Sequence, residues 1–186
     1  MVEAEDQARP GSLVLVHGPA RGGKSRWAET LLNDITPVTY VATAAARPDD
    51  ASWQERLRLH RSRRPDHWRL LEAGPDLPED LKRVPADHAV LIDALGGYVA
   101  QHLDAGSDTW ERQTKTLLSQ LSTMEQTCVV VIEETGWGVV PPTAIGGLFR
   151  DRLGALAQRL DRQAVASWLV VQGRALDLHA LGVPVP

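Results

Sequence analysis

The stretch VLVHGPARGGKSRWAETLL, residues Val14–Leu32, decides the fold. Within it, Gly18 and Gly23 bracket four residues. Lys24 and Ser25 follow directly, so the segment matches the pattern G-x-x-x-x-G-K-[ST]. The apolar run before the loop is typical of a buried strand, and the run after it is typical of a helix. Such a loop turns backbone N–H groups toward an anion at a helix start, which predicts polyphosphate binding. The simpler alternative is a glycine turn with an incidental Lys-Ser pair.

The two residues that end this loop have distinct expected roles. Lys24 would reach the β- and γ-phosphates of a nucleoside triphosphate as a point charge. The Ser25 hydroxyl would bind the Mg²⁺ that bridges these phosphates. Lys24 is therefore a candidate catalytic residue and Ser25 a candidate metal ligand. The predicted nucleotide-binding loop comprises Gly18, Pro19, Ala20, Arg21, Gly22, Gly23, Lys24 and Ser25.

Apolar runs of strand length recur along the chain, with amphipathic helical segments between most of them. This alternation predicts an α/β domain with a mostly parallel central sheet that helices cover on both faces. A surface segment with one short helix is expected over 74–85, which holds three prolines. The expected strands are Leu13–Val16, Val38–Ala42, Ala89–Ile92, Cys128–Ile132 and Trp168–Val171, and the longest expected helices cover 108–126 and 144–164.

Length and composition narrow the classes of protein that fit. The chain has 186 residues, and we expect one domain over 12–186 after a disordered, acidic tail over 1–11. The formal charge of −4 gives no general case for binding nucleic acid or an acidic membrane surface. The single cysteine, Cys128, permits no disulfide within the chain. No apolar stretch approaches the ~20 residues of a membrane helix. We therefore expect a soluble cytoplasmic protein.

Acidic side chains follow two of the expected strands. Asp93 ends the run AVLID, where ligands collect in open α/β sheets, and a carboxylate there can organise Mg²⁺ beside a phosphate loop. The alternative is an aspartate that caps a helix beginning near Gly96. Glu133 and Glu134 end the run VVVIEE, where either could organise metal, accept a proton or be an ordinary acid at a strand end. The phosphate loop favours metal binding for Asp93.

The stretch RLRLHRSRRPDHWRLLE, Arg56–Glu72, is unusual in a chain that is acidic overall. It holds six arginines and two histidines between Arg56 and Arg69. Three interpretations are open: a solvated helix face, a nucleic-acid-binding patch, or a phosphate-binding wall around a histidine. The predicted phosphate loop elsewhere in the chain favours the third.

An ordered set of motifs gives a resemblance to a known family. GPARGGKSRWAE is followed by YVATA, RLRLHRSRRPDHWRLLE, VLIDAL, EETGWGVVP, FRDRLG and WLVVQG, which together span Gly18–Gly173. The most specific are the histidine of H-R-x-x-R-P-x-x-W-x-x-x-E and the later segment E-x-G-x-G-x-V-P. On these motifs the chain resembles the bifunctional adenosylcobinamide kinase / adenosylcobinamide-phosphate guanylyltransferase family of cobalamin assembly. The resemblance implies a transferase with a P-loop NTPase-like (RecA-like) three-layer sandwich around a mostly parallel sheet.

The resemblance implies roles for residues of the arginine-rich stretch. The histidine of H-R-x-x-R-P, here His60, attacks the α-phosphate of GTP and carries GMP covalently, for which a neutral imidazole is a competent nucleophile. Arg61 and Arg64 would offset the charge that develops on the phosphates. Glu72 would accept hydrogen bonds from the guanine N1–H and amino groups. Thr43, in YVATA, would contact nucleotide.

The resemblance also implies a kinase reaction at the phosphate loop. GTP or ATP with Mg²⁺ would give its γ-phosphoryl group to the hydroxyl of the aminopropanol arm of adenosylcobinamide, with Lys24, Mg²⁺ and Asp93 neutralising charge. The new phosphate would then displace His60 from GMP to give adenosyl-GDP-cobinamide. By the same resemblance we expect a homotrimer whose partners are small molecules, with no nucleic acid and no membrane.

Several positions depart from the family pattern. An Asn of the pattern is Glu133 here, the Glu after V-P is Pro142, a nearby Arg is Gly147, and a later Asn is Ala157. These changes bear on corrinoid binding and on the subunit contacts, whereas the phosphate loop and His60 are intact. Three alternatives stay open: a small-molecule P-loop kinase, a nucleotide-binding regulatory module without guanylyltransferase activity, and a nucleic-acid binder.

Overall fold

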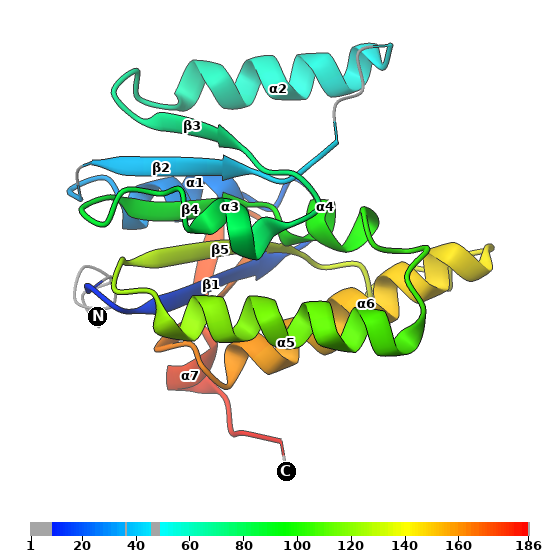
Figure 1. The fold of residues 1–186 in the computed structure, drawn as a ribbon. Coiled ribbons are helices and arrows are strands. Elements are labelled where there is room, and N and C mark those ends of the chain that lie inside the picture. The colour runs from blue at the N-terminus through cyan, green and yellow to red at the C-terminus, as the bar shows by residue number, and fades with distance from the viewer. Residues whose placement is uncertain (1–8, 36, 46–48, 186) are drawn as a thin grey trace.

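A seven-stranded sheet organises the chain, in a computed structural model that describes residues 9–35, 37–45 and 49–185. The strands are β1 (Leu13–Gly18), β2 (Val38–Ala42), β3 (Arg69–Glu72), β4 (Ala89–Asp93), β5 (Cys128–Glu133), β6 (Ala166–Val171) and β7 (Arg174–Asp177). Their order is β3-β2-β4-β5-β1-β6-β7, and only the β6–β7 pair is antiparallel (Figure 1). The first six strands therefore end at the same edge of the sheet.

The central strands are buried on both faces, as their near-continuous apolar sequences predict. Val14, Leu15 and Val16 of β1 have no exposed surface. Because successive side chains of a strand point to opposite faces, Leu13 and Leu15 join one core cluster while Val14 and Val16 join another. The sheet is thus the middle layer between two apolar layers.

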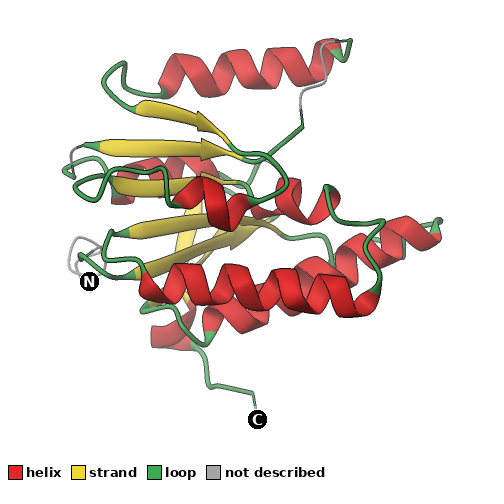
Figure 2. Ribbon diagram, viewed as in Figure 1, coloured by secondary structure: helices red, strands yellow, loops and turns green. Residues whose placement is uncertain are grey.

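Helices supply the two outer layers (Figure 2). Residues of α1 enter the core cluster on one face of the sheet, and residues of α3, α4, α5 and α6 enter the cluster on the other face. Helix α2 lies beyond the β3 edge of the sheet, and none of its described side chains is buried (Figure 1). The helices are α1 (Lys24–Leu31), α2 (Ala51–Arg63), α3 (Leu77–Leu81), α4 (Leu95–Ala100), α5 (Ser107–Thr123), α6 (Ala144–Asp161) and α7 (Leu178–Leu181).

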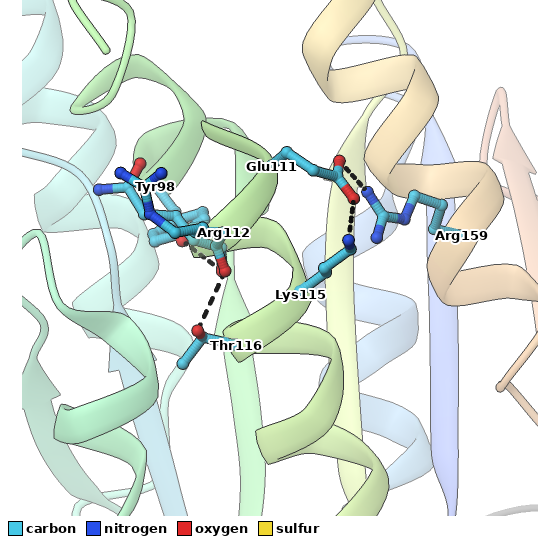
Figure 3. A network of polar contacts seen from close by, with 7 residues as sticks. Tyr98, Glu111, Arg112, Lys115, Thr116 and Arg159 are labelled. Carbon is cyan, nitrogen blue, oxygen red and sulfur yellow. Dashed lines mark hydrogen bonds and ion pairs between the residues drawn. The ribbon is translucent and has the colours of Figure 1, made fainter. Parts of the chain in front are cut away.

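An ion-pair network joins two helices of the larger layer (Figure 3). Arg159 of α6 donates from Nη1 to Oε2 of Glu111 in α5 at 2.8 Å, and Nζ of Lys115 lies 3.5 Å from Oε1 of the same carboxylate. The hydrogen bond from Arg159 is the main cause that lowers the pKa of Glu111. Because all three side chains are accessible to solvent, the network aligns the helices more than it stabilises them.

The fold class predicted from the sequence is confirmed, with differences at the ends of elements. All five expected strands are present, and three of them extend to Gly18, Asp93 and Glu133. The helix expected after the loop, from Arg26, begins two residues earlier at Lys24. The sequence does not predict β3 and β7, because β3 has one buried residue in four and β7 has none.

The first residues of the chain carry a prediction that the structure does not test. Most of the tail expected over 1–11 lies outside the described residues, so the division into a tail and a domain over 12–186 stays a prediction. Directly before β1, the backbone N–H of Ser12 donates to the carbonyl oxygen of Arg9 at 3.0 Å. Among the described residues, the helices are all too short or too polar to cross a membrane.

Candidate functional site

The loop between β1 and α1 closes tightly against β6. Gly18 has a φ of +146°, which L side chains rarely adopt, and a Cβ there would clash with the carbonyl oxygen of Val170. A Cβ on Gly22 would lie 2.5 Å from the same oxygen. The backbone N–H of Gly22 also donates to the carbonyl oxygen of Pro19 at 3.1 Å. Gly18 and Gly22 are therefore required by the approach of another backbone, and they fix the shape of the loop.

Lys24 and Ser25 form the first turn of α1, directly after the loop. Nζ of Lys24 bends back and donates to the carbonyl oxygen of Pro19 at 2.8 Å, and the residue is only 9% exposed. Ser25 is half-buried. A largely buried ammonium group and the positive end of a helix thus face one loop, which is the arrangement that binds phosphate groups.

Asp93, at the end of β4, is held by a side chain from the neighbouring strand. The hydroxyl of Tyr40, on β2, donates to Oδ2 of Asp93 at 3.0 Å. The guanidinium of Arg64 lies over the Tyr40 ring, with Cζ 5.0 Å from the ring centroid. Burial, and next the charge of Asp93, raise the pKa of Tyr40 well above its ordinary value. The phenol therefore remains a protonated donor at neutral pH.

Glu133 lies at the end of β5, between Asp93 of β4 and the loop that follows β1. Its Oε2 accepts a hydrogen bond from the backbone N–H of Gly96 at 2.8 Å. A Cβ on Gly96 would lie 2.6 Å from that oxygen, so a side chain there would displace the Glu133 carboxylate from this hydrogen bond. Burial is the largest cause that raises the pKa of Glu133; Asp93 raises it further, while Lys24 lowers it. Three charged side chains therefore interact at this edge of the sheet.

Thr43 lies directly after β2 and ties the strand to α4. Its side chain is buried, and Oγ1 donates to the carbonyl oxygen of Ala94. Its own carbonyl oxygen accepts a hydrogen bond from Nε2 of Gln101 at 2.7 Å. A Cβ on Gly97 would lie 2.5 Å from Oγ1 of Thr43. Thr43 thus lies at the edge of the sheet that carries Asp93, in a position that α4 holds firmly.

Most of the arginine-rich stretch lies in α2, which runs beyond β3 back toward the start of that strand, and only Glu72 reaches the edge where the strands end (Figure 1). His60 belongs to α2, and its side chain is outside the part of the chain that the structure describes. Arg61 is exposed on the same helix, and Glu72 is exposed at the end of β3. Because β5 and β4 separate β1 from β2, the loop after β1 is three strand spacings, or about 14 Å, from the end of β2. The structure therefore groups Lys24, Ser25, Asp93 and Glu133 around the loop and sets Arg61 and Glu72 apart.

Two polar residues of this region escape prediction from the sequence. Tyr40 interrupts the apolar strand VTYVA, and it contacts the carboxylate of Asp93. Gln101 follows α4 and holds the backbone of Thr43. The sequence does carry a signal for Tyr40, because a tyrosine in an otherwise buried strand needs a partner for its hydroxyl. No local pattern marks Gln101.

The positions that depart from the family pattern fall in different environments. Glu133 is in the site, Ala157 is a residue of α6 that packs against the core, and Pro142 and Gly147 flank the start of α6. Pro142 and Gly147 belong to the apolar loop segment, which we define as residues 137–148. Its most exposed apolar side chains are Trp137 (62%), Val139 (95%), Val140 (69%) and Ile145 (53%).

A parallel sheet in which an internal strand runs into a glycine loop and then a Lys-Ser turn defines the class of P-loop nucleotide-binding proteins. Comparison with known families narrows this class. The chain belongs to the cobinamide kinase / cobinamide phosphate guanyltransferase family, whose family model matches residues 14–178.

Curated relatives agree with this family. The chain is 32% identical over 176 residues to the bifunctional adenosylcobalamin biosynthesis protein CobU of Escherichia coli (strain K12), covering 87% of this chain and 96% of the relative. It is 34% identical over 167 residues to the protein CobP of Pseudomonas aeruginosa, which carries the same bifunctional description, covering 88% of this chain and 95% of the relative. The match therefore extends over nearly the whole of both relatives.

Solved structures share the fold at much lower identity. An ATPase from the type III secretion system of pathogenic bacteria aligns with a TM-score of 0.57 and 9% identity, covering 97% of this chain and 62% of that chain. A KaiC-like protein from Pyrococcus horikoshii OT3 aligns with a TM-score of 0.52 and 14% identity, covering 86% and 71%. Both show the P-loop, RecA-like fold alone.

Proposed function

We propose that this protein catalyses both reactions that give its family its name. It phosphorylates adenosylcobinamide with GTP or ATP, and then transfers GMP from GTP to the new phosphate, giving adenosyl-GDP-cobinamide for cobalamin biosynthesis. One observation carries the proposal: a chain of this family keeps a glycine loop closed against Val170, with Lys24 folded over it.

Phosphoryl transfer takes place at the loop between β1 and α1. Backbone N–H groups of residues 18–25 and the start of α1 bind the β- and γ-phosphates. Lys24 exchanges its hydrogen bond with Pro19 for a phosphate oxygen. The acceptor hydroxyl oxygen attacks the γ-phosphorus and releases its proton. The bond between the γ-phosphorus and the oxygen that bridges it to the β-phosphorus breaks. Positioning and charge neutralisation supply most of the rate.

Ser25 and Asp93 would hold Mg²⁺, which neutralises charge on the β- and γ-phosphates when bound. Their oxygens suit this ion, because Mg²⁺ prefers hard oxygen ligands and takes few of them from protein when phosphates and water complete its shell. In the described part of the chain, no three His, Cys, Asp or Glu side chains cluster closely enough to bind a metal ion. This supports a cation that arrives with the nucleotide.

Guanylyl transfer uses the arginine-rich stretch. An imidazole nitrogen of His60 attacks the α-phosphorus of GTP, an N–P bond forms, and pyrophosphate leaves. An oxygen of cobinamide phosphate then attacks the same phosphorus and releases His60. Arg61 and Arg64 offset the phosphate charge, and Glu72 accepts hydrogen bonds from guanine. Thr43, at the end of the strand beside β3, contacts the nucleotide.

We further propose that the protein works as a homotrimer in the cytoplasm, with small molecules and not nucleic acid as its partners. The apolar loop segment supports self-association, because several large apolar side chains lie exposed over a short stretch. The formal charge of −4 supports the absence of nucleic acid, since it gives no general attraction to phosphate backbones. The nucleotide substrates are abundant in the cytoplasm.

The test supplies purified protein with adenosylcobinamide, Mg²⁺ and GTP, and follows products by mass spectrometry. We expect cobinamide phosphate first and GDP-cobinamide second. Lys24→Ala should slow the first step by about 10²-fold or more, as removal of a group that stabilises transition-state charge does. His60→Ala should still form cobinamide phosphate but no GDP-cobinamide. A Lys115→Ala control should match the parent. Formation of neither product by protein that binds GTP would overturn the proposal.

A further inference from the structure

Tyr40 makes two polar contacts with different parts of the site. Its hydroxyl donates to Oδ2 of Asp93 at 3.0 Å. Its ring lies beneath the guanidinium of Arg64, whose Cζ is 5.0 Å from the centroid. The residue is 7% exposed and packs in the core cluster beside α1. One buried side chain therefore touches the carboxylate at the end of β4 and the residue that follows α2.

The hydroxyl contact is more than the satisfaction of a buried polar group. A hydrogen bond from a phenol to a carboxylate is charge-assisted, and it fixes the direction in which the carboxylate points. Residues that hold a metal-binding carboxylate in this way affect metal affinity as strongly as some ligands do.

The ring contact acts on a different element. Arg64 is the residue after the last residue of α2, and its stacking on Tyr40 attaches that end of the helix to β2. A stacked guanidinium gains from the aromatic face, and the gain increases with desolvation. None of the side chains described in α2 is buried, so this contact is one of the few that can hold the helix to the sheet.

We propose that Tyr40 is a positioning residue shared by the two reactions: its hydroxyl orients Asp93 for the metal–nucleotide complex, and its ring holds Arg64 at the end of α2. The inference rests on the proposed function for the metal role of Asp93. It adds to that function a physical link between the strand end beside the phosphate loop and the helix that carries His60.

The two tyrosines of the chain allow a matched experiment. Tyr40→Phe removes the hydroxyl that holds Asp93, and Tyr98→Phe removes a buried hydroxyl whose contact is a long one, 3.5 Å from the carbonyl oxygen of Gln113. The probe is Mn²⁺ with a non-hydrolysable GTP analogue, and free Mn²⁺ is measured by electron paramagnetic resonance. This readout reports metal affinity and does not require turnover.

We expect Tyr40→Phe to weaken Mn²⁺ binding about tenfold or more, in the range typical of residues that orient a metal ligand. Tyr98→Phe should stay within twofold of the parent, and Asp93→Asn should weaken binding at least as much as Tyr40→Phe. Unchanged affinity in Tyr40→Phe, beside a clear loss in Asp93→Asn, would overturn the positioning role while leaving the proposed function intact. Unchanged affinity in Asp93→Asn would instead overturn the metal assignment, and the positioning role with it.

The ring contact is tested by covalent labelling with α-³²P-GTP. Tyr40→Phe keeps the ring and, with Mg²⁺ and GTP both saturating, should label at a rate within threefold of the parent. Tyr40→Leu removes the ring and should label at least tenfold more slowly at saturating GTP, in protein that retains the parent circular dichroism spectrum. Equal labelling by both variants would overturn the link to α2. If Tyr40→Leu does not fold, a labelling rate in Arg64→Met equal to that of the parent overturns it instead.

Discussion

Lys24 lies folded over its own loop, with Nζ bonded to the carbonyl oxygen of Pro19. The same group is the one that the motif directs at phosphate, so nucleotide binding replaces an internal hydrogen bond with a charge-assisted one. Around it, Gly18 and Gly22 leave no room between the loop and Val170. The shape of the loop is therefore set before nucleotide binds, because only glycine at positions 18 and 22 lets the backbone of β6 pack this closely.

Gly22→Ala tests this packing. The new Cβ would lie 2.5 Å from the oxygen of Val170 and 3.1 Å from that of Pro19, and both are backbone atoms that cannot rotate away. Overpacking of this kind costs about 1–3 kcal/mol, and here it would destabilise the loop conformation that binds phosphate. We expect nucleotide affinity, measured by calorimetry, to fall by about tenfold or more. Parent-like affinity would show that the loop accommodates a methyl group.

Glu133 gives a prediction about pH. Its pKa in the folded protein is raised, mainly by burial, above the ordinary 4.5. Its contribution to stability is therefore fully present below pH 4.5 and is lost as the pH rises through the raised value, because the ionised form is less well solvated in the fold. Glu133→Gln cannot ionise and should avoid this loss.

The measurement compares free energies of unfolding in urea for the parent and Glu133→Gln, without nucleotide or metal, between pH 4 and pH 8. The variant should gain stability relative to the parent as the pH rises. A gap that stays constant, or that changes in the opposite direction, would contradict the raised pKa.

At the scale of elements, the predictable strands are those buried on both faces. Apolar runs in the sequence predict β1, β2, β4, β5 and β6, and most residues of these strands are buried in the structure. β3 and β7 are the two edge strands of the sheet, and most of their side chains are exposed. Their pairing is dictated by the neighbouring strand, so no local pattern identifies them.

Helix α6 allows a stability prediction of its own. Gly154 lies in the interior of this helix, and a Cβ there would meet no atom within 4 Å. Gly154→Ala should therefore stabilise the fold by about 0.5–1 kcal/mol, because alanine restricts the unfolded chain. Calorimetry should record a rise in melting temperature of about 1–4 °C.

A glycine in a short helix provides the contrast. Gly96→Ala, in α4, should lower the melting temperature, because its Cβ would lie 2.6 Å from Oε2 of Glu133. Similar shifts in the two variants would mean that helix propensity, and not packing, decides the outcome.

At the scale of the whole molecule, the edge of the sheet where the first six strands end carries the phosphate loop, Asp93, Glu133 and Glu72. The motif locates the loop, Lys24 and Ser25 without a structure, because that spacing is a local property of the chain. The contact of Tyr40 with Asp93 and that of Gly96 with Glu133 join residues far apart in sequence, so only the folded sheet reveals them. The roles of His60, Arg61 and Glu72 stay predictions from the family resemblance.

The assembly proposal concerns the apolar loop segment. Changing Trp137 to Ser and Val140 to Asp places polar groups where a neighbouring subunit would bury apolar ones, so we expect the trimer to dissociate. Sedimentation velocity should show three chains for the parent and a smaller species for the double variant. Leu181→Asp is the control, because Leu181 is 71% exposed outside the segment. Dissociation by Leu181→Asp alone would contradict the assignment of the interface.

We propose that one chain binds nucleotide at its glycine loop and carries GMP on His60. The most direct measurement incubates the protein with Mg²⁺ and α-³²P-GTP, beside His60→Ala, and separates the products by denaturing electrophoresis followed by an acid wash. We predict an acid-labile label on the parent and none on His60→Ala, because a phosphorus–nitrogen bond to histidine is hydrolysed by acid. Parent protein that binds GTP but takes up no label, or a label that persists in His60→Ala, would contradict the claim.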